Sequence, residues 1–259
     1  MPERPTIAEL RARTQPPEVR GRRNSEHWTA DLYQRRLSPY LTRVLIATSL
    51  TANAVTCLMI LTGAAAGAAL LVPGIGGALL AAFLGQLQML WDCCDGEVAR
   101  WRGTSSPVGV FLDKIGHYTA EGLIPIALGV RADGGLGSLG GWTTLGALLA
   151  VLVLFNKALN DAVHVARAAA GMPRLEDRAA SSAPTVAGVA RLRSWTRVLP
   201  FHRVFHSVEL TLVALVAAVL DLVLGGLEGT QGLVAVLLPV ALLTIAGHLL
   251  AILTSSRLR

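Results

Sequence analysis

The sequence has 259 residues, of which 53% are hydrophobic and 15% are charged, and its formal net charge is +6. A soluble domain carries about 25% charged residues, so this composition excludes an ordinary soluble protein and predicts an integral membrane protein. Nineteen of the 23 Lys and Arg residues lie in alternate segments between apolar stretches. That pattern is typical of one cytosolic membrane face, so a lipid surface explains the positive charge better than nucleic acid does.

Six apolar segments are long enough to cross a membrane, which takes about 20 mainly apolar residues each. The sequence therefore predicts an all-α, polytopic membrane protein with a six-helix transmembrane domain over residues 44–253. The predicted spans are 44–71, 75–99, 108–130, 139–166, 206–225 and 231–253.

The segment before the first span divides into two parts. Residues 1–25 hold several Pro and Arg residues and are predicted to be a disordered tail. Residues 26–43 mix Trp, Tyr and Leu with Arg. This mixture predicts either a juxtamembrane helix in the headgroup layer or an ordinary solvated helix.

The basic residues also predict how the chain is oriented in the membrane. Segments 1–43, 171–204 and 254–259 are basic, whereas the connections on the other side hold only Arg131. The positive-inside rule then places both termini and the loop 171–204 in the cytosol. We expect the plasma membrane as the location, and a short helix near residues 185–198 of the loop.

The second and third spans are not uniformly apolar. Asp92 and Asp95 lie one helical turn apart near the end of the second span, and so on one face. The third span begins with four ionisable residues within nine positions: Asp113, Lys114, His117 and Glu121. Charges in a bilayer are costly unless they face the bundle interior. Converging carboxylates suit Mg²⁺ or Mn²⁺, which predicts metal-assisted chemistry on a phosphorylated, lipid-like substrate.

The run that starts at Asp92 resembles the signature of the CDP-alcohol phosphotransferases, Asp-x2-Asp-Gly-x2-Ala-Arg-x8-Gly-x3-Asp-x3-Asp. Residues 51–56 also resemble that family's Pro-Asn-x-x-Thr stretch, with Ala52 in place of proline. The six-span topology extends the resemblance to most of the chain. Seven fixed positions of the signature match with every interval correct: Asp92, Asp95, Gly96, Ala99, Arg100, Gly109 and Asp113.

The resemblance implies transfer of a phospho-alcohol group, expected to be phosphatidyl, from a CDP-linked donor to an acceptor alcohol, with release of CMP in phospholipid biosynthesis. The donor is expected to be CDP-diacylglycerol or another CDP-alcohol, and the protein is expected to be a homodimer among membrane lipids. It further implies that Asp92, Asp95 and Asp113 hold one or two Mg²⁺ or Mn²⁺ ions. The residues implied at the CDP group are Asn53, Asp92, Gly96, Ala99, Arg100 and Gly109.

The last position of the signature departs from the family, because His117 stands where the family has an aspartate. The resemblance gives that aspartate two roles, metal ligand and base for the acceptor hydroxyl. Histidine can serve as a general base near neutral pH, and it can also bind a divalent metal, although it favours softer ions than Mg²⁺. The exchange also removes one negative charge, which weakens a second metal site. Glu121, one turn further on, can orient the His117 ring or compensate for the lost charge.

Residues that would bind the acceptor are less clearly marked. Lys157 and Arg167 recur with Asp161 and His164 along the fourth span, where one helix face can line an acceptor pocket. Arg203 lies in the basic loop. For the residues of the fourth span, charges that reach out of the membrane to water are at least as good an interpretation. For Arg203, a role in orienting the chain in the membrane is the favoured interpretation.

Two other functions are compatible with the sequence. One is a family member that binds CDP-lipid or metal without turnover, with His117 marking the loss of catalysis. The other is a cation transporter, which the one-sided position of the carboxylates and the lack of an inverted repeat disfavour.

Overall fold

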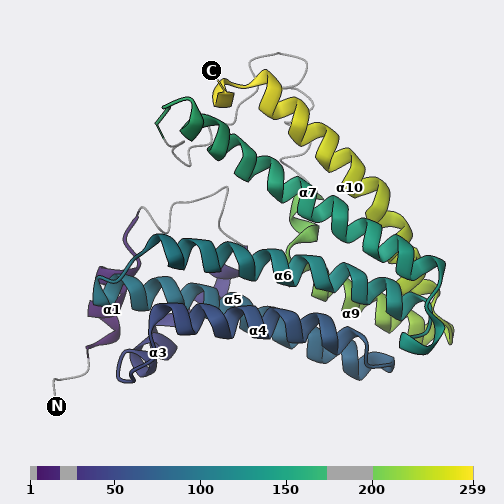
Figure 1. Cartoon of the computed structure of the whole chain (residues 1–259). Helices are drawn as coiled ribbons and strands as arrows, with labels where there is room; N and C mark the ends of the chain where they lie inside the picture. Colours follow the sequence, from purple (N-terminus) through teal and green to yellow (C-terminus); the bar gives the residue numbers. More distant parts are fainter. Residues whose placement is uncertain (1–4, 18–27, 174–200, 259) are drawn as a thin grey trace.

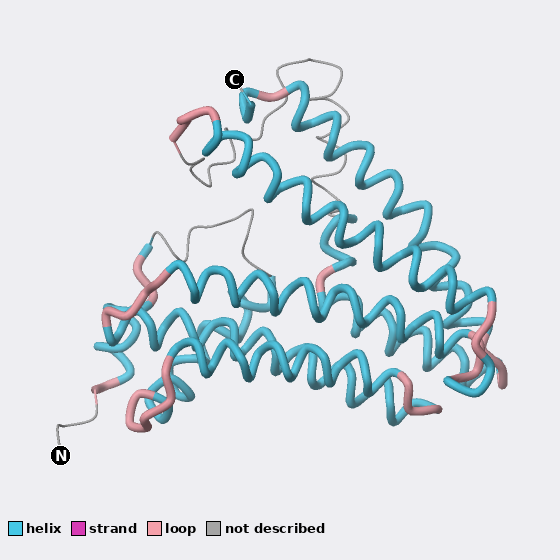
Figure 2. The backbone as a smooth tube through the Cα atoms, in the orientation of Figure 1, coloured by secondary structure: helices cyan, strands magenta, loops and turns pink. Residues whose placement is uncertain are grey.

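The computed structural model describes residues 5–17, 28–173 and 201–258, and most of these residues are in helices, with no strand among them (Figure 2). The all-α prediction is therefore confirmed. The six long helices are α4 (Ala52–Leu70), α5 (Gly74–Arg102), α6 (Pro107–Ala132), α7 (Gly141–Ala169), α9 (Ser207–Leu224) and α10 (Glu228–Thr254).

Five of the long helices, all except α6, are long and apolar enough to cross a membrane. Helix α6 corresponds to the predicted span 108–130, but charged residues in its first half, at its middle and near its end lower its hydropathy. The predicted number of six spans is thus not confirmed. Several apolar helices nonetheless indicate a multi-pass membrane protein.

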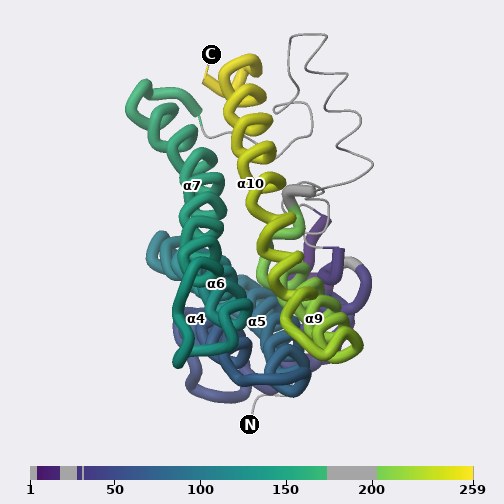
Figure 3. The backbone as a smooth tube through the Cα atoms, turned by 90° about the vertical axis from the view of Figure 1, so that its right-hand side faces the viewer, coloured from purple at the N-terminus to yellow at the C-terminus, as the bar shows by residue number. Residues whose placement is uncertain are grey.

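Helix α6 packs against α4, α7, α9 and α10. Helix α4 lies against α5 and α6, helix α9 lies against α5, and α10 packs on α7 and α9. In Figure 1, α4, α5 and α6 run side by side, while α7 and α10 are inclined away from them towards their C-terminal ends. Figure 3 shows α7 and α10 next to one another along their length.

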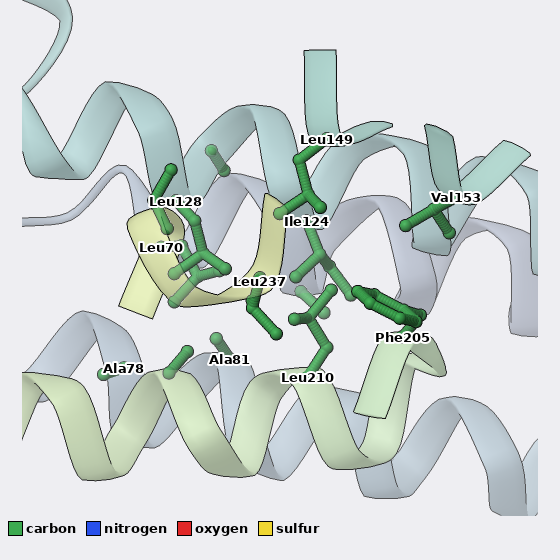
Figure 4. Packing of buried hydrophobic residues seen from close by; sticks show 14 of the residues in the cluster. Leu70, Ala78, Ala81, Ile124, Leu128, Leu149, Val153, Phe205, Leu210 and Leu237 are labelled. Carbon is green, nitrogen blue, oxygen red and sulfur yellow. The ribbon is translucent and has the colours of Figure 1, made fainter. Parts of the chain in front are cut away.

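A cluster of buried aliphatic residues holds these helices together at their centre (Figure 4). Ile124 and Leu128 of α6 pack with Leu149 of α7 and Leu210 of α9. In a lipid environment such contacts stabilise the bundle mainly through close packing, because lipid is as apolar as the helices.

The crossing of α6 and α7 depends on two glycines. A Cβ atom on Gly129 would lie 2.8 Å from the Cα of Gly146, and one on Gly146 would lie 2.7 Å from the Cα of Gly129. Real Cβ atoms do not approach other atoms so closely, so only glycine allows these backbones to meet. The two glycines therefore allow the close contact between the backbones of α6 and α7 at this crossing.

The N-terminal segment is more ordered than the sequence indicates. Within residues 1–25, predicted to be disordered, Ile7–Thr14 form helix α1 and Leu10 is fully buried. A capping box starts this helix: Thr6 Oγ1 accepts from the Glu9 amide at 3.2 Å, and Glu9 Oε2 accepts from the Thr6 amide at 2.7 Å. Helix α1 packs against α5.

The juxtamembrane helix predicted over 26–43 corresponds to a π-helical turn, η1 (Ala30–Gln34), followed by α3 (Arg35–Leu45). The first long helix then starts at Ala52, eight residues after the predicted start of the span at residue 44. Thr51 sets this start, because its Oγ1 accepts from the Ala54 amide at 3.1 Å.

The short helix predicted at 185–198, and most of the loop 171–204, lie outside the described residues. The described end of that loop is a 3-10 turn, η3 (Phe201–Phe205), which leads into α9.

Candidate active site

A tight turn brings the end of α5 next to the beginning of α6. Helix α5 ends at Gly103, whose φ of 67° lies in the left-handed region that glycine adopts readily. Ser106 begins α6 by accepting from the Gly109 amide at 3.2 Å, and Pro107 occupies the first turn. The two halves of the carboxylate motif therefore face each other at one end of the bundle, called here the motif end.

Three predicted metal ligands converge at the motif end. His117 Nε2 lies 3.3 Å from Asp92 Oδ1 and 3.6 Å from Asp113 Oδ1. One ligand atom from each of these residues lies within 4.8 Å of the others. The side chains of Asp92 and His117 are 22% and 21% exposed, and that of Asp113 is 41% exposed, so a ligand can reach them.

Asp95, the fourth predicted metal ligand, has a different neighbour. Its Oδ2 accepts a hydrogen bond from Thr56 Oγ1 of α4 at 2.7 Å. Asp95 is not part of the three-residue group, although it lies one turn from Asp92 on α5. Thr56 thus links the early stretch at residues 51–56 to the carboxylate motif.

Behind His117 lies a buried carboxylate surrounded by basic groups. The Glu121 side chain is 2% exposed, and its Oε1 lies 3.0 Å from Lys157 Nζ, 3.2 Å from His206 Nδ1 and 3.8 Å from His117 Nδ1. Lys157 comes from α7 and His206 precedes α9. Glu121 therefore connects three helices directly behind the converging ligands.

The residues implied at the CDP group gather at the same end. A Cβ atom on Gly109 would lie 3.3 Å from Asn53 Oδ1, so Asn53 of α4 faces the start of α6. A Cβ atom on Gly96 would lie 2.8 Å from the Arg100 guanidinium. Arg100 Nε itself donates to the Thr14 carbonyl at 2.6 Å, and Ala99 packs at the edge of a small apolar cluster.

The residues considered for the acceptor do not all lie together. Lys157 is at the Glu121 cluster, and Arg203 is in η3, three residues before His206. Arg167 donates from Nε and Nη2 to the Pro173 carbonyl at 3.1 and 2.7 Å, and from Nη1 to the Arg257 carbonyl at 2.8 Å. Those bonds tie the end of α7 to the C-terminal segment.

The structure also reveals a buried carboxylate that the sequence analysis missed. Glu97 is fully buried within the motif and accepts hydrogen bonds from Gln15 Nε2 at 2.8 Å, Ser38 Oγ at 2.5 Å and Thr42 Oγ1 at 2.7 Å. These donors come from the segment after α1 and from α3. Glu97 therefore anchors the N-terminal segment to the motif helix, and its position between Gly96 and the Ala-Arg pair was the only sequence signal.

The fold and the site define a class of protein: a helical membrane protein with two carboxylates and a histidine, residue types that can hold a metal ion, grouped at one end of the bundle. The sequence profile of the CDP-alcohol phosphatidyltransferase family matches residues 49–246, which is most of the chain. The protein belongs to this family, whose members are transferases that use CDP-alcohol donors and alcohol acceptors in membranes and generally depend on divalent metals. A search of curated proteins finds no match.

Proposed function

We propose that this protein transfers a phosphatidyl or related phospho-alcohol group from a CDP-linked donor to an acceptor alcohol and releases CMP. The observation that carries the proposal is the convergence of Asp92, Asp113 and His117 within 4.8 Å at the motif end. The family match supports the same reaction class. CDP-diacylglycerol is the proposed donor.

The acceptor hydroxyl oxygen attacks the donor's β-phosphorus, a new P–O bond forms, and the bond to the CMP oxygen breaks. Asp92, Asp95, Asp113 and His117 are the residues that would hold Mg²⁺ or Mn²⁺, as one or two ions. The donor set fits, because oxygen ligands from two helices face one another and are accessible. When bound, a divalent ion polarises the phosphorus and neutralises charge on the leaving phosphate.

The CDP end of the donor is proposed to lie against Asn53, Asp92, Gly96, Ala99, Arg100 and Gly109. Asn53 and Gly109 face each other across α4 and α6, so the glycine leaves room beside the Asn53 side chain. At Gly96 the missing side chain makes room for the Arg100 guanidinium, which lies 2.8 Å from where a Cβ atom would be. Gly109 lets a nucleotide approach the helix backbone closely, and Gly96 lets the Arg100 guanidinium lie against α5.

His117 has two alternative roles in this reaction, and both use Nε2, because Nδ1 faces Glu121. As a general base, Nε2 takes the proton of the acceptor hydroxyl. As a metal ligand, Nε2 has no lone pair left, and the proton passes to a carboxylate oxygen of Asp92 or Asp113. Either role predicts that His117→Ala abolishes turnover and that His117→Asp retains part of it.

The acceptor is proposed to bind near Lys157 and Arg203, with Arg167 further along α7. Lys157 supports this because its ammonium lies behind the cluster, 3.0 Å from Glu121. We further propose that the protein is a homodimer of the plasma membrane with both termini in the cytosol. The basic segments 1–43, 171–204 and 254–259 support that orientation.

The test is CMP release from CDP-diacylglycerol by the purified protein in detergent, with Mg²⁺ or Mn²⁺ and a panel of acceptor alcohols. Release that requires both a metal and one acceptor supports the proposal and identifies the acceptor. Binding of CDP-lipid without release under any acceptor indicates a non-catalytic member of the family. Cation flux through liposomes in the absence of nucleotide indicates a transporter.

A further inference from the structure

The motif end offers a nitrogen ligand where an all-carboxylate site would offer oxygen. His117 Nε2 lies 3.3 Å from Asp92 Oδ1 and 3.6 Å from Asp113 Oδ1, so the nitrogen and the two oxygens lie close together. Ligands at about 2.0–2.2 Å from one ion lie roughly 3 Å apart when they are adjacent, so the two nitrogen–oxygen separations need to shorten by only a few tenths of an ångström around a shared cation.

The orientation of the ring favours metal binding through Nε2. The other nitrogen, Nδ1, faces Glu121 Oε1 at 3.8 Å and makes no hydrogen bond of its own. A shift of roughly half an ångström turns this contact into a hydrogen bond. A carboxylate behind the ring then fixes the proton on Nδ1 and leaves the Nε2 lone pair facing the other ligands, which is the usual arrangement of a metal-binding histidine.

Glu121 is held in place for this role by groups on two other helices. Lys157 Nζ and His206 Nδ1 lie 3.0 and 3.2 Å from its Oε1, and its side chain is 2% exposed. A buried carboxylate that contacts an ammonium and an imidazole is held in position by them. The Glu121 carboxylate therefore lies at a fixed position next to His117 Nδ1 and keeps Nε2 directed towards Asp92.

Mixed nitrogen and oxygen ligands change which cation is preferred. Mg²⁺ takes oxygen ligands and keeps much of its water, whereas first-row transition ions gain affinity from an imidazole. We infer that this site selects a first-row transition cation, such as Mn²⁺ or Co²⁺, over Mg²⁺, with His117 as a ligand and Glu121 as the residue that positions it. The inference rests on the proposed metal site but is independent of turnover.

The test measures Mn²⁺ bound to the purified protein by electron paramagnetic resonance, with Mg²⁺ as competitor and without any substrate. Coupling of the Mn²⁺ electron spin to ¹⁴N reports a directly bound imidazole. The wild type is expected to show this coupling and to prefer Mn²⁺ over Mg²⁺ by at least about tenfold.

In His117→Asp the nitrogen coupling is expected to disappear and the preference to fall by about tenfold, because the site becomes all-oxygen. In Glu121→Gln the Mn²⁺ affinity is expected to drop by about 10- to 100-fold while the coupling persists in the bound fraction. His164→Asp is the matched control: it makes the same exchange at an exposed position of α7 and should change neither quantity.

Absence of Mn²⁺ binding, binding without nitrogen coupling, or an unchanged preference in His117→Asp would each overturn the inference. Measuring CMP release with Mg²⁺ on the same samples tests the proposed function separately from the inference about metal selectivity. Release without nitrogen coupling refutes only the inference, whereas a nitrogen-coupled site without release under any acceptor refutes only the transferase.

Discussion

The two ends of the helical bundle use polar side chains in opposite ways. At the end away from the motif, Arg131 donates to the carbonyls of Val72 and Gly74 at 3.1 and 2.8 Å, and Asp221 accepts from the Thr230 amide at 2.9 Å. These side chains satisfy backbone groups at helix ends. At the motif end, Asp92, Asp113 and His117 face each other and the solvent.

This difference shows how to separate structural from functional charges in an apolar bundle. A charged side chain that completes the hydrogen bonds of a helix end stabilises the fold. Charged side chains that face one another, accessible and without backbone partners, cost stability unless a ligand binds. The contrast predicts where substitutions affect activity and where they affect folding.

The largest expected effect is that of metal removal. Stripping divalent cations with EDTA should lower CMP release by at least about 100-fold, because the polarisation that a bound cation supplies is worth several kcal/mol. Adding Mn²⁺ or Mg²⁺ back should restore it. Undiminished release after chelation would mean that the facing carboxylates at the motif end do not act through a cation.

Glu97 lies at the motif end, but its carboxylate accepts three hydrogen bonds and so resembles the structural Asp221 of the opposite end. In Glu97→Ala, Gln15 and the two hydroxyl donors of α3 lose their acceptor, which should weaken the docking of α1 by about 3 kcal/mol. Hydrogen exchange of the α1 amides measures this loss. Glu228→Ala, at an exposed position, is the matched control, and equal protection of α1 in both variants would refute the anchoring role.

Arg131 tests the opposite end directly. Arg131→Ala removes the donors that reach the Val72 and Gly74 carbonyls, so the protein should lose about 1–3 kcal/mol of stability. The melting temperature in detergent measures this, with exposed Arg36→Ala as the control. CMP release by the folded fraction should stay within about twofold of the wild type. A large loss of turnover without a loss of stability would contradict the structural role assigned to the charged side chains of this end.

The smallest effect concerns Asp133 in the turn before α7. The hydroxyl and amide of Thr143, with the amides of Gly140 and Trp142, donate to its carboxylate and lower the pKa of Asp133 below its usual value. A lowered pKa means that its contribution to stability is complete above the unfolded pKa, near 4, and is lost as the pH falls through the lower folded pKa.

The protection factor of the Thr143 amide, which corrects its exchange rate for the intrinsic effect of pH, should therefore fall in the wild type below about pH 4. In Asp133→Asn the same amide should show no such titration. A pH dependence of equal size in both proteins would assign it to another group.

The contrast between the ends also explains what the sequence could predict. Asp92, Asp113 and His117 were expected to converge because helical spacing and a short turn, both local features, are enough to bring them together. The later start of α4 at Ala52 follows from the Thr51 cap, a local signal that hydrophobicity alone hides. These parts of the fold depend on neighbours in the chain.

Contacts between distant segments were not predictable in the same way. The bond from Gln15 to Glu97 spans 82 positions, and the approach of His206 to Glu121 spans 85. Nothing in local periodicity pairs these residues, because the pairing depends on which helices pack together. The sequence therefore identified the facing carboxylates but not the anchor of the N-terminal segment.

The most direct test of the account compares the same exchange at the two ends of the bundle. CMP release from CDP-diacylglycerol should fall by at least about 100-fold in Asp92→Asn and stay within about twofold of the wild type in Asp133→Asn, with both proteins folded. Equal turnover in Asp92→Asn and the wild type would contradict the claim that the motif end is where the transfer takes place.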